Sequence, residues 1–305
     1  MKSAVCWEDQ CGKNMKKKLS LFNIINTTIM SLLCLSIVYP FLNTFAKSLS
    51  SDFSITMGLV TLYPVEFRLS NYQKIIFSRS FYYALRNTVI IVIIGTSFSL
   101  SIVLAAGYAL SRKILGCKWL FLIILFTMFF SGGMIPLYLQ VRSLKLYNTL
   151  WALILPGSFS VYNMILARNF FLQLPDGVLE SGAIDGCNEL MLFAKIAIPM
   201  SKPIIASLTL MTMVGYWNIF MPGILYLDQA RLYPLQVYVR QVVFSANAAL
   251  DTSVIDAATL DEIFLSSYEG IKSAVLILAT LPIACVYPFL QKYFVKGLNM
   301  GAIKG

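Results

Sequence analysis

Long apolar runs alternate with short polar or basic segments along the whole chain. The runs cover residues 19–45, 84–110, 119–139, 150–172, 204–227 and 273–290. A transmembrane helix needs roughly 20 consecutive, mainly apolar residues, and each run is close to that length. The pattern therefore predicts an all-α membrane protein with six transmembrane helices, which form one membrane domain over residues 19–297.

Composition agrees with a chain embedded in lipid. Of the 305 residues, 58% are hydrophobic and 12% are charged, whereas a soluble domain carries about twice that charged fraction. The net charge of +10 would also suit a protein that binds nucleic acid. In a membrane protein, an excess of lysine and arginine on the cytoplasmic side explains this charge better, so no nucleic acid partner is expected.

The basic residues also predict how the helices are oriented. Six helices place both termini on the same side of the membrane. If that side is the cytoplasm, it holds 14 of the 24 lysine and arginine residues, concentrated beside the ends of the spans, where the positive-inside rule applies most strongly. Residues 1–18 and 298–305 are then cytoplasmic tails, and residues 46–83 and 228–272 are external loops.

The second external loop contains apolar residues near helical spacing: Leu232, Leu235, Val239 and Val243. This spacing favours an amphipathic helix. Such a helix either lies on the outer face of the membrane or only caps the helix bundle, and both alternatives remain open at this point.

Several kinds of chemistry lack their residues in this sequence. Histidine does not occur, and the six cysteines are scattered without a CxxC pair, which argues against histidine-dependent catalysis, a zinc site and a disulfide framework. No G-x-x-x-x-G-K-[ST] loop is present to hold ATP. The central parts of the apolar runs contain no Asp, Glu, Lys or Arg, whereas ion-coupled secondary transporters usually carry such residues there. We therefore expect no catalytic residue, cofactor or metal site in this chain.

The segment between the fourth and fifth runs, residues 175–200, has the pattern of two short helices joined by a glycine turn. Gly186 can adopt the left-handed conformation that ends a helix, and Asn188 is suited to cap the next helix. Glu180 and Asp185 offer carboxylates to a basic partner.

Other features of this segment fit an element that docks on a partner. Three small residues, Ser181, Gly182 and Ala183, keep the first helix slim enough to enter a groove. Pro199 interrupts the chain before the next span. A slim, acidic hairpin on the cytoplasmic side would suit the transmission of force from another protein.

At these positions the chain resembles the EAA loop of ABC importer permeases, whose pattern is Glu, two small residues, a Gly, and later Ile and Leu-Pro. Ser181 and Gly182 replace the two alanines and Ile198 replaces the leucine, which conserves size or character. The resemblance implies the type I ABC importer permease fold and a loop that docks on an ATPase subunit. The coupling residues expected from it are Glu180, Ser181, Gly182, Ala183, Asp185, Gly186, Ile196 and Pro199.

Other stretches resemble the sugar branch of the family, on the side of the maltose-type second permease. They are Asn71-Tyr72-Gln73 before Asn87-Thr88, residues 133–138, 148–156 and 215–218, and residues 287–297, which are similar to permeases for oligosaccharides and polysaccharide fragments. The resemblance implies a multi-pass subunit of a bacterial plasma (inner) membrane complex. Its partners would be a second homologous permease, two ATPase subunits that bind ATP and Mg²⁺, an external sugar-binding protein and membrane lipid.

Within the spans, aromatic and amide side chains would suit a sugar, which needs stacking and hydrogen bonds. The candidates for the solute path are Tyr138, Asn163, Tyr216, Trp217 and Asn218. For each of them the alternative is ordinary packing, with the polar groups satisfied between helices. An ABC permease for amino acids or peptides shares the EAA loop and stays an alternative to a sugar permease, and an ion-coupled secondary transporter is a more distant one.

Overall fold

The computed structural model describes residues 21–112, 114–130, 132–251, 269–286 and 288, and within these residues the regular structure is helical. The labelled elements in the first half of the chain are α1 (Leu21–Ser48), α2 (Asp52–Thr56), α3 (Ser70–Ile76), α4 (Arg79–Ser111), α5 (Cys117–Phe129), α6 (Met134–Ser143) and α7 (Trp151–Ile154). Those in the second half are α8 (Val161–Phe171), α9 (Asp176–Ile184), α10 (Glu189–Met191), the π-helical η1 (Leu192–Ala197), α11 (Ile198–Met200), α12 (Lys202–Trp217), α13 (Met221–Tyr226), the 3₁₀ turn η2 (Ala230–Leu232) and α14 (Leu235–Asp251). A last apolar helix covers Glu269–Val286. The predicted tails 1–18 and 298–305 lie outside the described residues.

Three of the described helices are individually long and apolar enough to cross a membrane. They are Phe22–Ser48, Arg79–Ser111 and Glu269–Val286, and they coincide with the first, second and sixth predicted runs. Two bent helix pairs raise the number to five if each pair is one span. The all-helical membrane architecture predicted from the sequence is therefore confirmed, and the count of six stays a prediction.

The third, fourth and fifth runs differ from the continuous helices expected of them, because each one is interrupted, with proline or glycine at or near the break. In the third run, α5 ends at Phe129 and α6 begins at Met134, with Gly133 at φ 86° between them. In the fourth, α7 and α8 flank residues 155–160, which include a Pro-Gly pair. In the fifth, α12 ends at Trp217, and α13 has Pro222 in its first turn. Proline lacks the N–H that a continuing helix requires, and glycine permits the backbone to turn.

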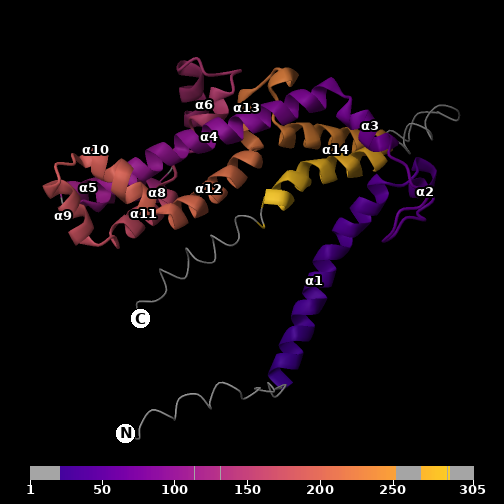
Figure 1. The fold of residues 1–305 in the computed structure, drawn as a ribbon. Helices are drawn as coiled ribbons and strands as arrows, with labels where there is room; N and C mark the ends of the chain where they lie inside the picture. Colours follow the sequence, from indigo (N-terminus) through magenta and orange to yellow (C-terminus); the bar gives the residue numbers. More distant parts are fainter. Residues whose placement is uncertain (1–20, 113, 131, 252–268, 287, 289–305) are drawn as a thin grey trace, which may run out of the picture.

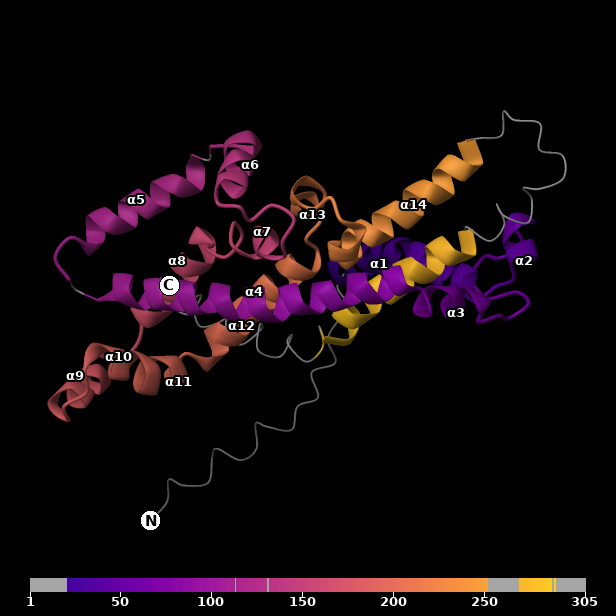
Figure 2. The same ribbon diagram turned by 90° about the horizontal axis from the view of Figure 1, so that it is seen from above.

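Helix α4 is the element around which the others pack. It runs along the main body and lies against α8 and α12 (Figures 1 and 2). Two glycines on its buried side permit this close approach. A Cβ at Gly95 would lie 2.8 Å from the Tyr216 ring, and one at Gly107 would lie 2.9 Å from the Ala167 Cβ. Small residues let helices pack tightly in lipid, where no hydrophobic force drives them together.

Helix α1 contrasts with α4, because it extends away from the main body (Figure 1). Only 6% of its most apolar window is buried, against 39% for α4. Its exposed side chains are large and apolar, for example Phe22, Leu35 and Phe41. This surface suits lipid, which is the environment that the sequence predicts for it.

The end of the molecule near α2, α3 and α14 contains the external segments predicted from the sequence. Helix α14 packs against α4 and buries Leu235 and Val239. The Asn87 amide donates to the Arg231 carbonyl over 2.8 Å, and the Thr88 hydroxyl accepts from the Leu235 N–H over 2.7 Å. The helix expected in this loop is confirmed, and in the described residues its apolar face caps the bundle.

Candidate coupling hairpin and transport cavity

The segment 175–200 forms a helical hairpin at one end of the molecule, beside the end of α4, and α9 lies farthest out (Figures 1 and 2). Its turn has the predicted local chemistry. Helix α9 ends at Ile184, and Gly186 has the left-handed φ of 85°. Asn188 caps α10, because its Oδ1 accepts from the Met191 N–H over 2.8 Å.

Gly182 makes an internal contact that the sequence did not reveal. The sequence suggested that its small size helps α9 to enter a partner's groove, but Gly182 is buried within the hairpin itself. A Cβ at this position would lie 2.6 Å from the Ile196 Cδ1 and 2.8 Å from the Leu192 Cδ2. Gly182 therefore lets α9 pack directly on η1, and Ile196, also a motif residue, is part of that internal contact.

The remaining motif residues are on the surface of the hairpin. The exposed ones are Glu180, Ser181, Ala183, Asp185, Gly186 and Pro199. Two of them are carboxylates, so the free surface of α9 is acidic at its middle and at its end. This exposed surface is available to another chain. The packing of α9 on η1, on the opposite side of the helix, holds α9 in place.

The hairpin continues directly into α12 through a sharp bend. The segment Glu189–Met200 and helix α12 are inclined by 84° to each other, and Ser201 lies at the bend. The Ser201 hydroxyl is buried and has no hydrogen-bond partner among the described residues. The six-residue π-helix η1 precedes the bend, and π-helical turns are often found at functional positions of helices.

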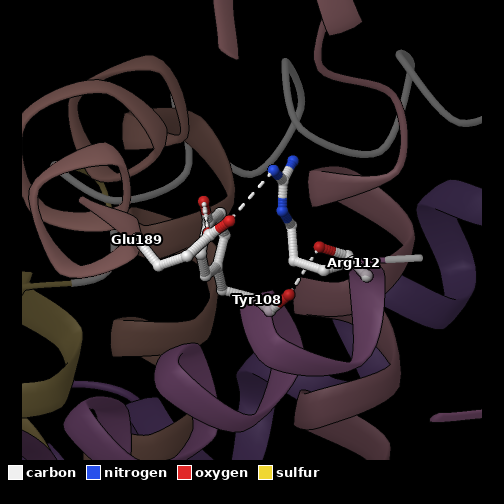
Figure 3. Close-up of polar contacts among 4 residues, drawn as sticks. Tyr108, Arg112 and Glu189 are labelled. Atoms are coloured by element: carbon white, nitrogen blue, oxygen red, sulfur yellow. Dashed lines mark hydrogen bonds and ion pairs between the residues drawn. The ribbon is translucent and has the colours of Figure 1, made fainter. Parts of the chain in front are cut away.

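Tyr108, near the end of α4, joins the hairpin to the helix bundle. Its ring packs edge-on against Phe171 of α8, with 5.6 Å between centroids, and lies 5.0 Å from the Phe193 ring of η1. Its hydroxyl donates to Glu189 over 3.2 Å, and Arg112 donates to the same carboxylate over 3.3 Å (Figure 3). The sequence analysis missed these three polar residues, because the partners are 77 and 81 residues apart along the chain.

A cavity of about 430 Å³ lies near the middle of α4, between α4, α8, α12 and the interrupted segments. Of the five residues predicted for the solute path, Asn163 and Tyr216 line it. The sequence analysis missed the other polar side chains of its wall, which are Ser99, Ser160, Thr212 and Tyr226. The combination of hydroxyl groups, an amide and an aromatic ring can donate and accept hydrogen bonds and can stack on a flat apolar face.

Both predicted residues are also held by the protein. The Tyr216 hydroxyl donates to the Ile154 carbonyl over 3.0 Å, and the Asn163 Nδ2 lies 3.4 Å from the Thr212 hydroxyl. These contacts agree with the packing alternative considered for both positions, and a role in the solute path stays a prediction. Their orientation is fixed, which is a useful property for side chains that border a cavity.

A second cavity of about 560 Å³ adjoins the first and shares Leu137, Pro222 and Tyr226 with it. Gly133 and Gln140 contribute to its wall, so the break between α5 and α6 borders this space. The interruptions of the third and fifth runs therefore shape both cavities, which agrees with the rule that irregular backbone at membrane depth occurs where it lines a cavity.

The other three predicted residues lie outside both cavity walls. Trp217 donates its indole N–H to the Ala279 carbonyl over 3.1 Å and borders a separate apolar cavity of about 210 Å³. Asn218 is exposed and bonds to Val214. Tyr138 stacks on Tyr226 with 6.2 Å between ring centroids, so it contacts a residue of the cavity wall.

The loop between α6 and α7 is fixed to the chain after α13. Asn148, at φ 59°, accepts hydrogen bonds from the N–H groups of Asp228 (2.8 Å) and Gln229 (3.3 Å). The Tyr147 hydroxyl donates to the Asp228 carboxylate over 2.8 Å. This hydrogen bond is the main reason that the pKa of Tyr147 is raised to about 12. These contacts hold the chain directly after Tyr226, which lies in the wall of the larger cavity.

Comparison with known families decides the class of this protein. Residues 21–300 match the family described as "Binding-protein-dependent transport system inner membrane component". The chain belongs to this family. It is therefore an integral permease subunit of an ABC-type importer, as the EAA-like segment predicted, and its fold is the type I permease fold.

Among curated relatives of this permease, two from Bacillus subtilis (strain 168) are each 37% identical to it. One is the polygalacturonan/rhamnogalacturonan transport system permease protein YtcP, with 93% of this chain and 99% of YtcP covered. The other is protein LplC, with 93% and 95% covered. The arabinooligosaccharides transport system permease protein AraQ of Halalkalibacterium halodurans is 29% identical, with 95% and 100% covered.

A solved structure also matches the permease over nearly its whole length. It is a chain from the crystal structure of a bacterial ABC transporter involved in the import of the acidic polysaccharide alginate. The match has a TM-score of 0.82 at 30% sequence identity and covers 91% of this chain and 98% of that chain. The predicted fold class is thus confirmed by a homologous structure.

Proposed function

We propose that this permease imports oligosaccharides or polysaccharide fragments. It forms the translocation path with a second, homologous permease and takes up the solute from an external sugar-binding protein. Two ATPase subunits on other chains bind ATP and Mg²⁺ and drive the cycle. The central observation is the exposed acidic hairpin, which projects from the bundle at one end of α4 and is continuous with the cavity-lining helix α12.

The hairpin is suited to dock on a basic groove of an ATPase subunit. Glu180 on α9 and Asp185 directly after it are exposed, and their carboxylates can pair with cations across an interface. Gly182 provides a tight internal contact that keeps the docking surface in one shape. The hydrolysis of ATP itself belongs to the partner, because the sequence contains no phosphate-binding loop.

The proposed substrate class rests on the relatives and on the larger internal spaces. Relatives are named for the transport of polygalacturonan and rhamnogalacturonan and of arabinooligosaccharides, and a structural relative belongs to an ABC transporter involved in the import of alginate. The two adjoining cavities have hydroxyl, amide and aromatic groups in their walls. Each sugar ring has hydroxyl groups that form hydrogen bonds and a less polar face that stacks on an aromatic ring, so these walls suit a short saccharide.

The orientation proposed from the sequence agrees with this role. The hairpin must face the cytoplasm, where ATP is, and α14 and the Tyr147 loop must then face outward. Both termini are placed in the cytoplasm, in keeping with the basic residues 16–18 before the first span. Residues 46–83 and 228–272 would form the external surface that meets the binding protein.

The test is to express the permease with the genes that accompany it and to purify the complex in detergent. Co-purification of a second permease and an ATPase is expected. ATP hydrolysis should then rise when the binding protein is loaded with one member of a panel of galacturonan, rhamnogalacturonan, arabinan and alginate fragments. Absence of an ATPase chain would contradict the coupling role, and stimulation by an amino acid or peptide instead of any saccharide would contradict the substrate class.

A further inference from the structure

Helix α4 connects the hairpin to the cavity as one uninterrupted rod. It carries Ser99 in the cavity wall and Tyr108 at the hairpin junction. Tyr108 is the ninth residue after Ser99, which corresponds to about 14 Å along the helix axis. A displacement of one end of α4 therefore reaches the cavity, provided that the hairpin is attached firmly to the other end.

The attachment has a buried layer and an exposed layer. In the buried layer, the rings of Tyr108, Phe171 and Phe193 come from α4, α8 and η1 and pack on one another at centroid distances of 5.0–6.4 Å. In the exposed layer, Arg112 pairs with Glu189 over 3.3 Å, and the Tyr108 hydroxyl donates to the second carboxylate oxygen (Figure 3). The Arg112 guanidinium also lies 5.8 Å above the Tyr108 ring.

The Glu189 carboxylate thus accepts hydrogen bonds from both the Tyr108 hydroxyl and the Arg112 guanidinium at the end of α4. It is the first residue of α10, and Asn188 caps the same helix, so the backbone that carries it is fixed. Arg168 fixes the other side, because its Nε donates to the Leu110 carbonyl over 3.0 Å. The end of α4 is therefore held by α8 on one side and by the hairpin on the other.

We propose that Arg112, Glu189 and Tyr108 form a latch that keeps the hairpin in a constant position relative to α4 while the ATPases move it. This deepens the proposed function and depends on the coupling role given there to the hairpin. The latch supplements the covalent path through Ser201 and α12. Because both α4 and α12 border the cavity, movement of the hairpin would shift two of its walls together instead of one.

The size of the effect follows from the exposure of the pair. The side chain of Arg112 is 29% exposed and that of Glu189 is 64% exposed. An ion pair with this exposure contributes only about 0.2–1 kcal/mol, which corresponds to a change of up to about five-fold in an equilibrium. Single substitutions of this pair should therefore shift the position of the hairpin by an amount that can be measured.

The test measures a distance in the whole transporter, with the binding protein and ATPases present. Spin labels at Ala105 of α4 and Ala194 of η1, both exposed positions, report the separation of α4 and the hairpin. With the native latch, the distance should be the same without nucleotide and after trapping with Mg-ATP and vanadate. In Arg112→Glu and in Glu189→Arg, the fraction of molecules with a displaced hairpin should rise up to about five-fold. The variant that carries both substitutions has opposite charges again, so the distance between its spin labels should return to the native value.

Two further variants separate the latch from a general structural role. Tyr108→Phe keeps the aromatic packing and removes one hydrogen bond, so it should give a smaller rise than Arg112→Glu. Lys118→Glu reverses an exposed cation at the start of α5 that has no ion pair within the described chain, and it should leave the distance unchanged. An equal response to Lys118→Glu would indicate a general charge effect and would overturn the latch.

Other outcomes also decide the question. A native distance that changes with nucleotide, or a double variant that fails to restore it, overturns the latch. Loss of the ATPase chains from Arg112→Glu would assign the pair to docking and would also overturn it. If the native complex contains no ATPase chain, the proposed coupling function fails. If the ATPase is present and the charge reversals have no effect, only the latch fails.

Discussion

The hairpin and the cavity are attached to α4 in opposite ways. Around the cavity, the helices approach so closely that a glycine takes the place of a side chain, as at Gly95 beneath the Tyr216 ring. At the hairpin, the polar contact with α4 is an exposed ion pair with a tyrosine beside it. The difference indicates that close packing fixes the shape of the cavity wall, whereas the position of the hairpin relative to α4 depends on a few side-chain contacts that single substitutions can break.

The largest expected effect comes from breaking the close packing. Gly107→Leu should destabilise the protein by about 1–3 kcal/mol, because overpacking forces helices apart. The space at Gly107 is bounded by the Ala167 Cβ at 2.9 Å and by the Arg168 backbone N at 3.1 Å, so the neighbours cannot rotate away. Thermal unfolding of the detergent-solubilised complex measures the loss.

Gly215→Leu is the matched control, because a Cβ at Gly215 meets no atom within 4 Å although it also lies within a span. We expect this variant to keep its stability and to transport less, because Gly215 borders the cavity. Equal losses of stability for Gly107→Leu and Gly215→Leu would show that the close contacts at Gly107 do not cause the loss.

Gly182 provides a test of the internal contact of the hairpin. Gly182→Ala should be tolerated, because the new methyl group meets only the flexible ends of Ile196 and Leu192. Gly182→Leu should separate α9 from η1 at a cost of about 1–3 kcal/mol and reduce the amount of ATPase that co-purifies. Normal ATPase binding by Gly182→Leu would show that α9 does not need η1 behind it.

A smaller effect is expected where the cavity wall is held by a single hydrogen bond. Tyr216→Phe removes the bond to the Ile154 carbonyl and keeps the ring above Gly95. The stability should fall by about 1 kcal/mol, the usual net contribution of one hydrogen bond. Tyr162→Phe, at an exposed position of α8, should be neutral in the same unfolding measurement, and equal losses in the two variants would contradict this explanation.

The smallest effect concerns the external loop and appears only at alkaline pH. Tyr147 has a pKa of about 12 instead of 10, chiefly because it donates to Asp228. In the folded state the proton is held more tightly, so the stabilisation is complete below pH 10 and disappears as the pH rises to about 12. Asp228→Asn should lower the pKa of Tyr147. The titration of Tyr147 is isolated by subtracting the absorbance titration of Tyr147→Phe from that of the parent, and the same subtraction in the Asp228→Asn background gives the shifted pKa. An unchanged pKa in Asp228→Asn would exclude Asp228 as the cause.

The turn of the hairpin could be predicted from sequence because its determinants are local. Gly186 adopts the left-handed φ and Asn188 caps the following helix, as their residue types indicate. The positions of the long spans could be predicted for a similar reason, since apolar composition over a window determines them. The coupling role of the hairpin is a separate matter and stays a prediction.

Other features could not be predicted, because they depend on contacts between distant segments. Ser99 and Thr212 face one cavity only after α4 and α12 pack, and Glu189 meets Arg112 across 77 residues of sequence. The close packing of Gly182 on η1 could not be predicted either, since the sequence cannot reveal that η1 lies against it. Trp217 and Asn218 follow Tyr216 directly, but in a helix consecutive side chains point in different directions, so only Tyr216 borders this cavity.

The central claim is that the hairpin transmits work between the ATPases and the solute path, and Gly186 tests it most directly. Gly186→Val places a β-branched residue at φ 85° and should disturb the turn at a cost of about 1–2 kcal/mol. Gly186→Asn is the milder control, because asparagine tolerates this conformation. The measurement is the stimulation of ATP hydrolysis by the loaded binding protein in the reconstituted transporter. We predict loss of stimulation with normal membrane insertion for Gly186→Val and substantial retention for Gly186→Asn, whereas full stimulation and transport by Gly186→Val would contradict the account.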